Sequence, residues 1–112
     1  NKIYFMSKNA MLGIINQVFE IEKKLIDSGN QDKFKRNISR IYFELEEEFN
    51  FVVKNPTGEN YTDGRLDCDA NVVGDLASQM KISETLKPAV YQKDDEGNFK
   101  IVQKAVVIVS AK

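Results

Sequence analysis

The chain has 112 residues, of which 42% are hydrophobic and 29% charged, proportions typical of a single globular domain. Its net charge of −1, with acids and bases interspersed, argues against a sequence-independent nucleic-acid-binding protein, which needs a basic face to displace counterions. No uncharged apolar stretch approaches the roughly 20 residues that a membrane span requires, so no membrane contact is expected.

The first predicted element is a helix that ends at the "DSGN" turn, Asp27–Asn30. Its apolar residues recur at spacings of three and four, which is typical of a helix with one buried face. The central stripe consists of Met11, Ile14, Val18, Ile21 and Leu25. It is widened on one side by Leu12, Ile15, Phe19 and Ile26. Ser7 and Asn9 are the candidate N-caps, and Gly29 is suited to the C-terminal turn.

A second helix is predicted from Gln31 to about Phe51. Its apolar face contains Phe34, Ile38, Ile41, Tyr42, Leu45, Phe49 and Val52. Two helices joined by a short glycine turn form an antiparallel hairpin. The two stripes cover only one another, so the wide first stripe leaves apolar surface for a second copy of the chain. The sequence therefore predicts a helical dimerisation segment over residues 1–53, with the central stripe of the first helix at the dimer interface.

The remaining residues, 54–112, are predicted to form a small, mainly antiparallel β-domain. "KNPTGENYTDGR" is a turn-rich linker, and three runs after it are rich in β-branched residues: "ANVVG", "KISETLKPAVY" and "NFKIVQKAVVIVS". "DDEG" supplies a hairpin turn between the last two runs. Pro88 cannot donate to a ladder, which predicts an edge strand or a bulge there. Helices followed by strands indicate the α+β class.

The residues that usually carry catalysis are scarce in this sequence. There is no histidine, which removes the commonest general base and the commonest metal ligand. Cys68 is the single cysteine, so we interpret it as a structural thiol in a chain suited to the reducing cytosol. Asp67, Asp69 and Asn71 alternate as in a calcium loop, but Val72 stands where that loop requires glycine. The sequence predicts no enzyme, metal or cofactor; a small enzyme using Asp67, Asp69 and Cys68 is the least favoured alternative. The opening "NKIYFMSKNA" predicts no signal peptide.

Three stretches of the second half match, in order, short motifs of one protein family. In "NPTGENYTDGRLDCDA", the matching residues are Gly58, Glu59, Tyr61, Asp63 and Ala70. In "ISETLKPAVY" they are Leu86 and Tyr91, and in "KIVQKAVVIV" they are Val102, Ala105, Val107 and Val109. The sequence departs from the family pattern at Cys68 in place of histidine, Ala89 in place of glycine, and Gln103-Lys104 in place of Arg-Pro.

These stretches resemble the β-domain of nucleotide exchange factors of the GrpE type. The resemblance implies a homodimer joined through a four-helix bundle. It also implies that the β-domain binds the nucleotide-binding domain of a DnaK-type chaperone and promotes ADP release. The competing interpretation is a non-enzymatic α+β interaction domain with an unknown partner.

Four residues of the β-half are the candidate contacts with such a partner. They are Tyr61, Arg65, Val72 and Lys87. Tyr61 offers a large amphipathic contact, Arg65 a forked donor for a carboxylate, and Lys87 a charge of longer range. The alternative roles are that Tyr61 closes the core, Arg65 pairs with Asp67, and Lys87 stays in water.

Overall fold

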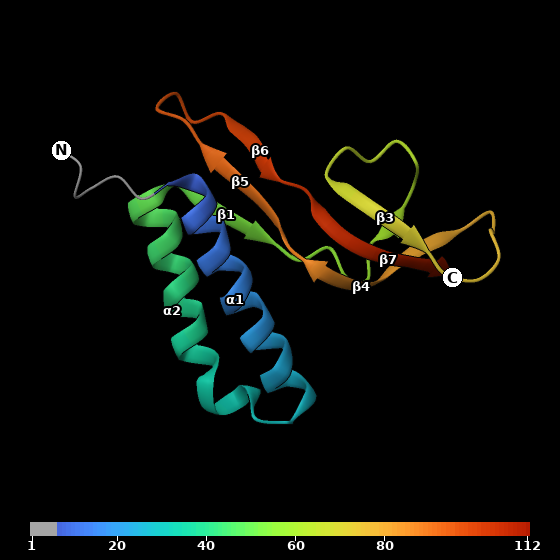
Figure 1. The fold of residues 1–112 in the computed structure, drawn as a ribbon, viewed down its shortest axis with the longest axis horizontal. Helices are drawn as coiled ribbons and strands as arrows, with labels where there is room; N and C mark the ends of the chain where they lie inside the picture. Colours follow the sequence, from blue (N-terminus) through green and yellow to red (C-terminus); the bar gives the residue numbers. More distant parts are fainter. Residues whose placement is uncertain (1–6) are drawn as a thin grey trace. The chain divides into compact units, whose positions relative to one another are not determined.

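The computed structural model describes residues 7–112 and confirms the α+β class, with two helices followed by mainly antiparallel strands (Figure 1). The opening six residues, part of the stretch in which no signal peptide is predicted, lie outside the described part. The chain divides into two compact units, Asn1–Phe49 and Asn50–Lys112, which are described separately below. The boundary between the units follows Phe49, whereas the sequence predicts a boundary after residue 53. The difference arises because the residues just after Phe49 form a strand.

The first unit is an antiparallel helical hairpin made of α1 (Lys8–Asp27) and α2 (Gln31–Phe49). Ser7 caps α1, since its side-chain oxygen accepts a hydrogen bond from the backbone N–H of Ala10 at 3.0 Å. Gly29 has a φ of 75°, a conformation that favours glycine, and the chain reverses there. Between the helices, the Tyr42 hydroxyl donates to the Glu22 carboxylate at 3.2 Å.

Helix α2 ends two residues before the predicted end at about Phe51. The helix ends at Phe49, Asn50 adopts a left-handed φ of 61°, and strand β1 (Phe51–Lys54) begins directly afterwards. Asparagine tolerates this conformation better than most residues, so it can end a helix as glycine does. Val52 continues the helical spacing in the sequence, but in the structure it lies opposite Tyr91 in a sheet.

The second unit contains two sheets. The three-stranded sheet has the order β1-β5-β6, with β5 at Ala89–Lys93 and β6 at Phe99–Gln103. The four-stranded sheet has the order β2-β4-β7-β3. Its strands are β2 (Asn60–Tyr61), β3 (Cys68–Val72), β4 (Met80–Lys87) and β7 (Ala105–Ala111). All pairs are antiparallel except β3 with β7, which is parallel.

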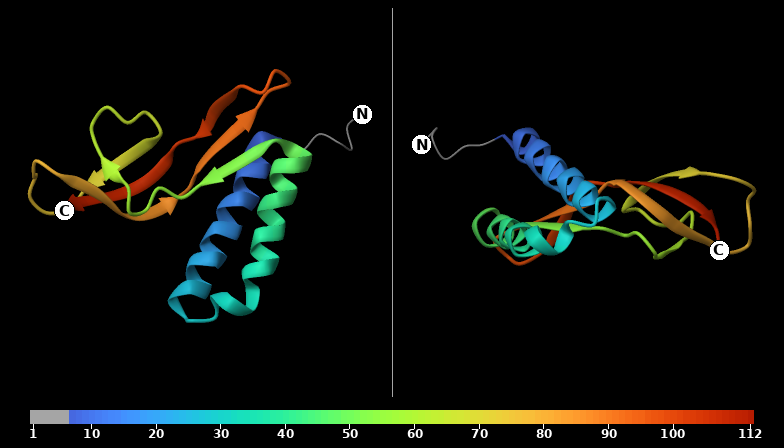
Figure 2. Two further views of the ribbon diagram at one scale, coloured as in Figure 1. Left: turned by 180° about the vertical axis from the view of Figure 1, so that it is seen from behind. Right: turned by 90° about the horizontal axis from the view of Figure 1, so that it is seen from below.

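One long hairpin runs through both sheets, as the views of Figure 2 show. Strand β4 continues past Pro88 into β5, and β6 continues past Lys104 into β7. Its turn is the predicted one: Asp94 Oδ1 accepts the backbone N–H groups of Glu96 and Asn98, both at 2.9 Å. The hairpin therefore serves as the common frame to which the shorter strands are added.

Of the two alternatives predicted for Pro88, an edge strand or a bulge, the structure contradicts the edge strand and agrees with an irregularity in the pairing. The strands on either side of it, β4 and β5, each pair with two neighbours. Pro88 is buried at the junction between the sheets, next to a shift in register between Thr85 and Lys87. Its carbonyl accepts a hydrogen bond from the Gln103 side chain at 2.8 Å. Because the chain leaves one ladder and enters another at this point, the missing N–H breaks neither ladder.

The core of the second unit lies in the four-stranded sheet and around its junction with the other sheet. Alternate residues of β7 are buried, as expected when one face of a strand packs inward. The core cluster consists of Cys68, Ile82, Ala89, Ala105, Val107 and Val109. This small cluster holds the scaffold on which the candidate partner-binding residues are placed.

Candidate partner-binding surface

Three of the four candidate contact residues are spread over the four-stranded sheet, and the fourth, Arg65, lies in the loop between β2 and β3. Tyr61 is opposite Met80 on β4, and Val72 is opposite Val109 on β7. Lys87 is opposite Val106, towards the other end of β7. Tyr61 and Val72 therefore lie towards the same end of the sheet, on strands separated by β4 and β7, while Lys87 lies towards the opposite end.

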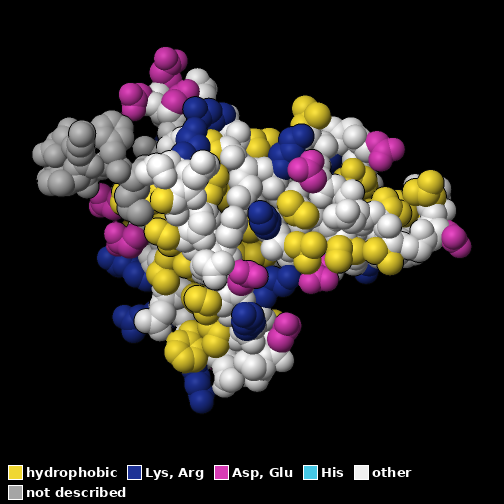
Figure 3. Space-filling view, viewed as in Figure 1, with side chains coloured by type: hydrophobic (Ala, Val, Ile, Leu, Met, Phe, Trp, Pro, Cys, Tyr) yellow, Lys and Arg dark blue, Asp and Glu magenta, His cyan; other side chains and the backbone are white. Residues whose placement is uncertain are grey.

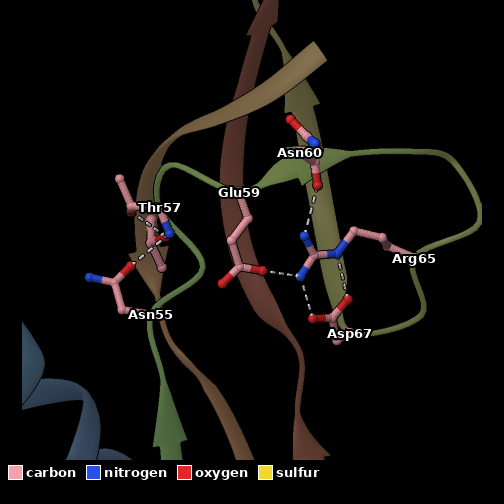
Figure 4. Close-up of polar contacts among 7 residues, drawn as sticks. Asn55, Thr57, Glu59, Asn60, Arg65 and Asp67 are labelled. Atoms are coloured by element: carbon pink, nitrogen blue, oxygen red, sulfur yellow. Dashed lines mark hydrogen bonds and ion pairs between the residues drawn. The ribbon is translucent and has the colours of Figure 1, made fainter. Parts of the chain in front are cut away.

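Arg65 is at the centre of a polar network in the second unit (Figure 4). Two nitrogens of its guanidinium donate hydrogen bonds to the two carboxylate oxygens of Asp67, Nε to Oδ1 at 3.0 Å and Nη2 to Oδ2 at 2.8 Å. Nη2 also donates to Glu59 Oε1 at 3.0 Å, and Nη1 donates to the Asn60 backbone carbonyl at 2.9 Å. One side chain thus connects the start of β2 to the segment leading into β3.

The electrostatics of this network follow from the paired charges. The hydrogen bonds from Arg65 hold the pKa of the Asp67 carboxyl below its usual value, although partial burial acts in the opposite direction. The hydrogen bond to Asp67 likewise raises the pKa of Arg65. The guanidinium binds groups of the same chain, so Arg65 has the alternative role of pairing with Asp67. Its hydrogen bonds stabilise the loop between β2 and β3.

The other candidates differ in how accessible they are. Tyr61 is partly buried and packs against the core cluster, which is its alternative role of closing the core. Lys87 is exposed at the end of β4. Val72 is exposed at the end of β3, where the next residue, Val73, donates its backbone N–H to the Val109 carbonyl at 2.9 Å. Val72 is therefore an accessible apolar side chain on a well-anchored segment.

Further exposed apolar residues near Val72 were not predicted. Val73 is 56% exposed and Leu76 is 82% exposed, both in the loop between β3 and β4. Figure 3 shows apolar side chains at the end of the sheet that carries this loop. Apolar residues in a loop with Gly74 and Asp75 were the signal in the sequence that could have identified them. Leu66, in the loop before β3, is also largely exposed.

Cys68 is buried in the core cluster of the second unit. Burial, together with the neighbouring Asp67 carboxylate, raises the pKa of its thiol. A reactive cysteine needs the opposite environment, one that is accessible and favours the thiolate. The structural interpretation of Cys68 is consistent with these surroundings.

We expect Cys68→Ala to lower the free energy of unfolding by only about 1–2 kcal/mol, because it removes one small buried group. Urea denaturation measures this change. In the native wild-type chain, alkylation by iodoacetamide at pH 8 should be slow, since the thiol is buried and protonated. The same chain in urea is the control and should react quickly. Rapid alkylation under native conditions would contradict this account of Cys68.

Within residues 7–112, no three His, Cys, Asp or Glu side chains come together as a metal site would require. Neither of the two helices is long and apolar enough to cross a membrane, as judged over the same residues.

The predicted dimerisation stripe of α1 is divided between buried and accessible positions. Met11 is buried, with Ile15 and Phe19 one and two turns further along the helix. Ile14 is 46% exposed and Ile21 is 50% exposed, while the remaining two members are partly buried, namely Val18 and Leu25. The part of the stripe available to a partner is therefore the ridge Ile14, Val18, Ile21 and Leu25.

The second helix also leaves apolar side chains exposed. They are Phe34, Ile41, Phe43 and Phe49. Figure 3 shows apolar side chains along the helical hairpin. One of them, Phe43, lies under the Arg40 guanidinium, 5.4 Å from its ring centroid, and Arg40 also pairs with Glu44 at 2.9 Å.

Comparisons with protein-family models, with curated protein sequences and with solved structures gave no match to this chain.

Proposed function

We propose that this chain is a nucleotide exchange factor of the GrpE type, which binds the nucleotide-binding domain of a DnaK-type chaperone and promotes ADP release. The proposal is one of binding without catalysis, and it needs no metal or cofactor. A partner that binds the open form of a chaperone better than the closed form shifts the equilibrium towards the open form. A cytoplasmic location is part of the proposal, since a single free cysteine suits a reducing compartment.

The observation that carries the proposal is the exposed apolar group Val72, Val73 and Leu76 at one end of the four-stranded sheet. Protein interfaces obtain most of their binding energy from a few anchors placed on a rigid support. Here the support is provided by the pairing of β3 with β7 and by the backbone hydrogen bond from Val73 to Val109. The proposed anchors are therefore Val72, Val73 and Leu76, with Lys87 as an outlying charge.

We further propose that two copies associate through the helical hairpin. The support comes from the ridge of Ile14, Val18, Ile21 and Leu25, two of whose members are about half exposed. An isologous four-helix arrangement would bury this ridge together with exposed apolar residues of α2, such as Phe34 and Ile41. Contiguous exposed apolar surface is a common mark of protein interaction sites.

The test is the rate at which a DnaK-type chaperone releases a fluorescent ADP analogue. The wild-type chain should accelerate release. Leu76→Asp should reduce that acceleration at least about tenfold, because it removes an apolar anchor and places a charge at the interface. Ala77→Asp is the matched control, since it adds the same charge at the next position in the loop. It should retain most of the acceleration.

Lack of acceleration by the folded wild-type chain, across several chaperones of this type, would overturn the proposal. The interaction-domain interpretation would then remain. If Leu76→Asp and Ala77→Asp reduced the acceleration of release equally, the effect would come from the added charge and not from the loss of an apolar anchor.

A further inference from the structure

Strand β3 (Cys68–Val72) is an open edge of the four-stranded sheet (Figure 1). Among residues 7–112 it pairs with β7 alone, since the sheet order β2-β4-β7-β3 places it at the end. Its register with β7 runs without a shift, and neither proline nor glycine interrupts it. The edge at the other side of the sheet, β2, is only two residues long. Strand β3 is therefore the edge of this sheet that can accept a further strand.

Two hydrogen bonds show which backbone groups of β3 point outwards. The carbonyl of Asp67 accepts an N–H from the start of β7 at 2.8 Å, and the N–H of Val73 donates to the carbonyl of Val109 at 2.9 Å. In a parallel pair, alternate residues direct both of their backbone groups towards the neighbouring strand. Because Asp67 and Val73 face β7, the residues of even number between them face away from it. Ala70 and Val72 thus present N–H and C=O groups to the open edge.

The two faces of β3 differ in chemistry. Ala70 and Val72 lie on the face of the core cluster, where Ala70 packs against the cluster and Val72 is 46% exposed. Asp69 lies on the opposite face and is exposed, because successive side chains of a strand alternate. An added strand would therefore meet apolar side chains on one face and a carboxylate on the other.

The charges along β3 are predominantly acidic. The strand and the loop that follows it contain two aspartates, Asp69 and Asp75, and no lysine or arginine. Asp67, just before the strand, is paired with Arg65. Lys104 lies 3.9 Å from Asp69, but both side chains are exposed, so this long ion pair contributes little and leaves the carboxylate accessible. A strand that carries lysine or arginine on this face is favoured over an acidic one.

We propose that β3 binds an extended segment of alternating apolar and basic residues as an additional antiparallel strand, the direction that is more stable per residue. In this arrangement the apolar side chains of the segment lie opposite Ala70 and Val72, and a lysine or arginine lies opposite Asp69. Backbone hydrogen bonds provide the pairing, and the two faces select the sequence. Val72 is also one of the proposed chaperone anchors, so the inference rests on the proposed function and names the kind of chaperone segment that this end of the sheet holds.

The first experiment titrates the isotopically labelled full chain with a peptide of about seven alternating Val and Lys residues, a usual strand length. NMR shift changes should be largest at the backbone amides of Ala70 and Val72, which face the added strand. In an antiparallel pair, the valines opposite these residues direct their own N–H groups to β3. N-methylation of the valines should therefore abolish binding, and N-methylation of the lysines, the matched control, should preserve it. Shift changes concentrated elsewhere, or equal effects of the two methylations, would overturn the proposal.

The second experiment reverses the charge. Asp69→Lys should weaken binding of the Val-Lys peptide by about tenfold and favour a Val-Asp peptide instead, because attraction on that face becomes repulsion. Asp95→Lys, in the exposed turn between β5 and β6, is the matched control and should leave the peptide preference unchanged. The NMR spectrum of each variant reports its folding. A folded Asp69→Lys chain with the wild-type preference would contradict this assignment of the ligand.

Failure of this inference can be told apart from failure of the proposed function, because peptide binding needs no chaperone. Acceleration of ADP release without peptide binding at β3 would overturn the strand addition alone. Peptide binding without acceleration of ADP release would overturn the exchange function and leave the strand site. Concentration-dependent shifts at Ala70 and Val72 without any peptide would identify a second copy of the chain as the occupant, and would overturn the assignment to a partner segment.

Discussion

The double variant Ile14→Asp, Ile21→Asp is expected to be a folded monomer at concentrations where the wild-type chain is expected to form the proposed dimer. Both side chains are about half exposed on the same ridge of α1, so the substitutions remove apolar surface and add charge at the proposed helical interface. Burying a side chain of this size contributes about 1.5–3 kcal/mol, and an isologous dimer contains each position twice. The association constant should therefore fall by more than about 100-fold. Sedimentation velocity across a range of concentrations measures it.

The matched control for this variant is Gln17→Asp, Lys24→Asp. Gln17 and Lys24 are exposed on α1 and are separated by the same seven-residue interval as Ile14 and Ile21. This control adds the same side chains beside the ridge without removing any of its apolar side chains, and it should remain dimeric. Far-UV circular dichroism establishes that both chains are helical. A wild-type chain that stays monomeric at high micromolar concentration would rule out the dimer.

Arg65→Ala is expected to lower the free energy of unfolding by about 1–3 kcal/mol, the range for lost hydrogen bonds to charged groups. It removes the fork to Asp67 and the contacts to Glu59 and Asn60, and leaves the half-buried Asp67 carboxylate without its cation. Arg65→Lys keeps the charge but cannot bind both carboxylate oxygens in the same way, so it should recover only part of the loss. Urea denaturation provides the measurement. If Arg65→Ala were as stable as wild type, the network would not brace the loop.

The difference in the free energy of unfolding between wild type and Arg65→Ala should depend on pH, which tests the role of Arg65 independently. Arg65 depresses the pKa of Asp67 in the folded chain, so the stabilisation is fully present above the unfolded carboxyl pKa of about 3.9. This stabilisation is lost as the pH falls through the lower pKa that Asp67 has in the folded chain. The stability gap between wild type and Arg65→Ala should therefore be constant near neutrality and shrink below about pH 4. A gap that widens on acidification would contradict this assignment.

The sequence by itself determined the elements whose signals are local. The apolar periodicity around Met11–Leu25 specified a helix, Ser7 had the side chain to cap it, and Asp94 had the carboxylate to hold the hairpin turn. Such signals act between residues a few positions apart, and they have the same effect whatever the rest of the chain does. The α+β class followed from the order of these elements along the chain.

Only the tertiary structure decided which residues meet across long distances in sequence. The start of β1 at Phe51, the parallel pairing of β3 with β7, and the position of Pro88 between two sheets all depend on partners remote along the chain. In the same way, helical spacing placed Met11 and Ile14 on one stripe, but packing buried the first and left the second half exposed. A repeat of 3.6 residues gives the direction of a side chain and not what lies opposite it.

The candidate sites show the same division. Arg65 and Asp67 are two residues apart, so their pairing was among the possibilities that the sequence offered. The contact with the Asn60 carbonyl, the anchoring of Val73 by Val109, and the open edge of β3 were not, because each depends on strand order. Strand order is set by which pairings bury the most apolar surface together, and that is a property of the folded chain as a whole.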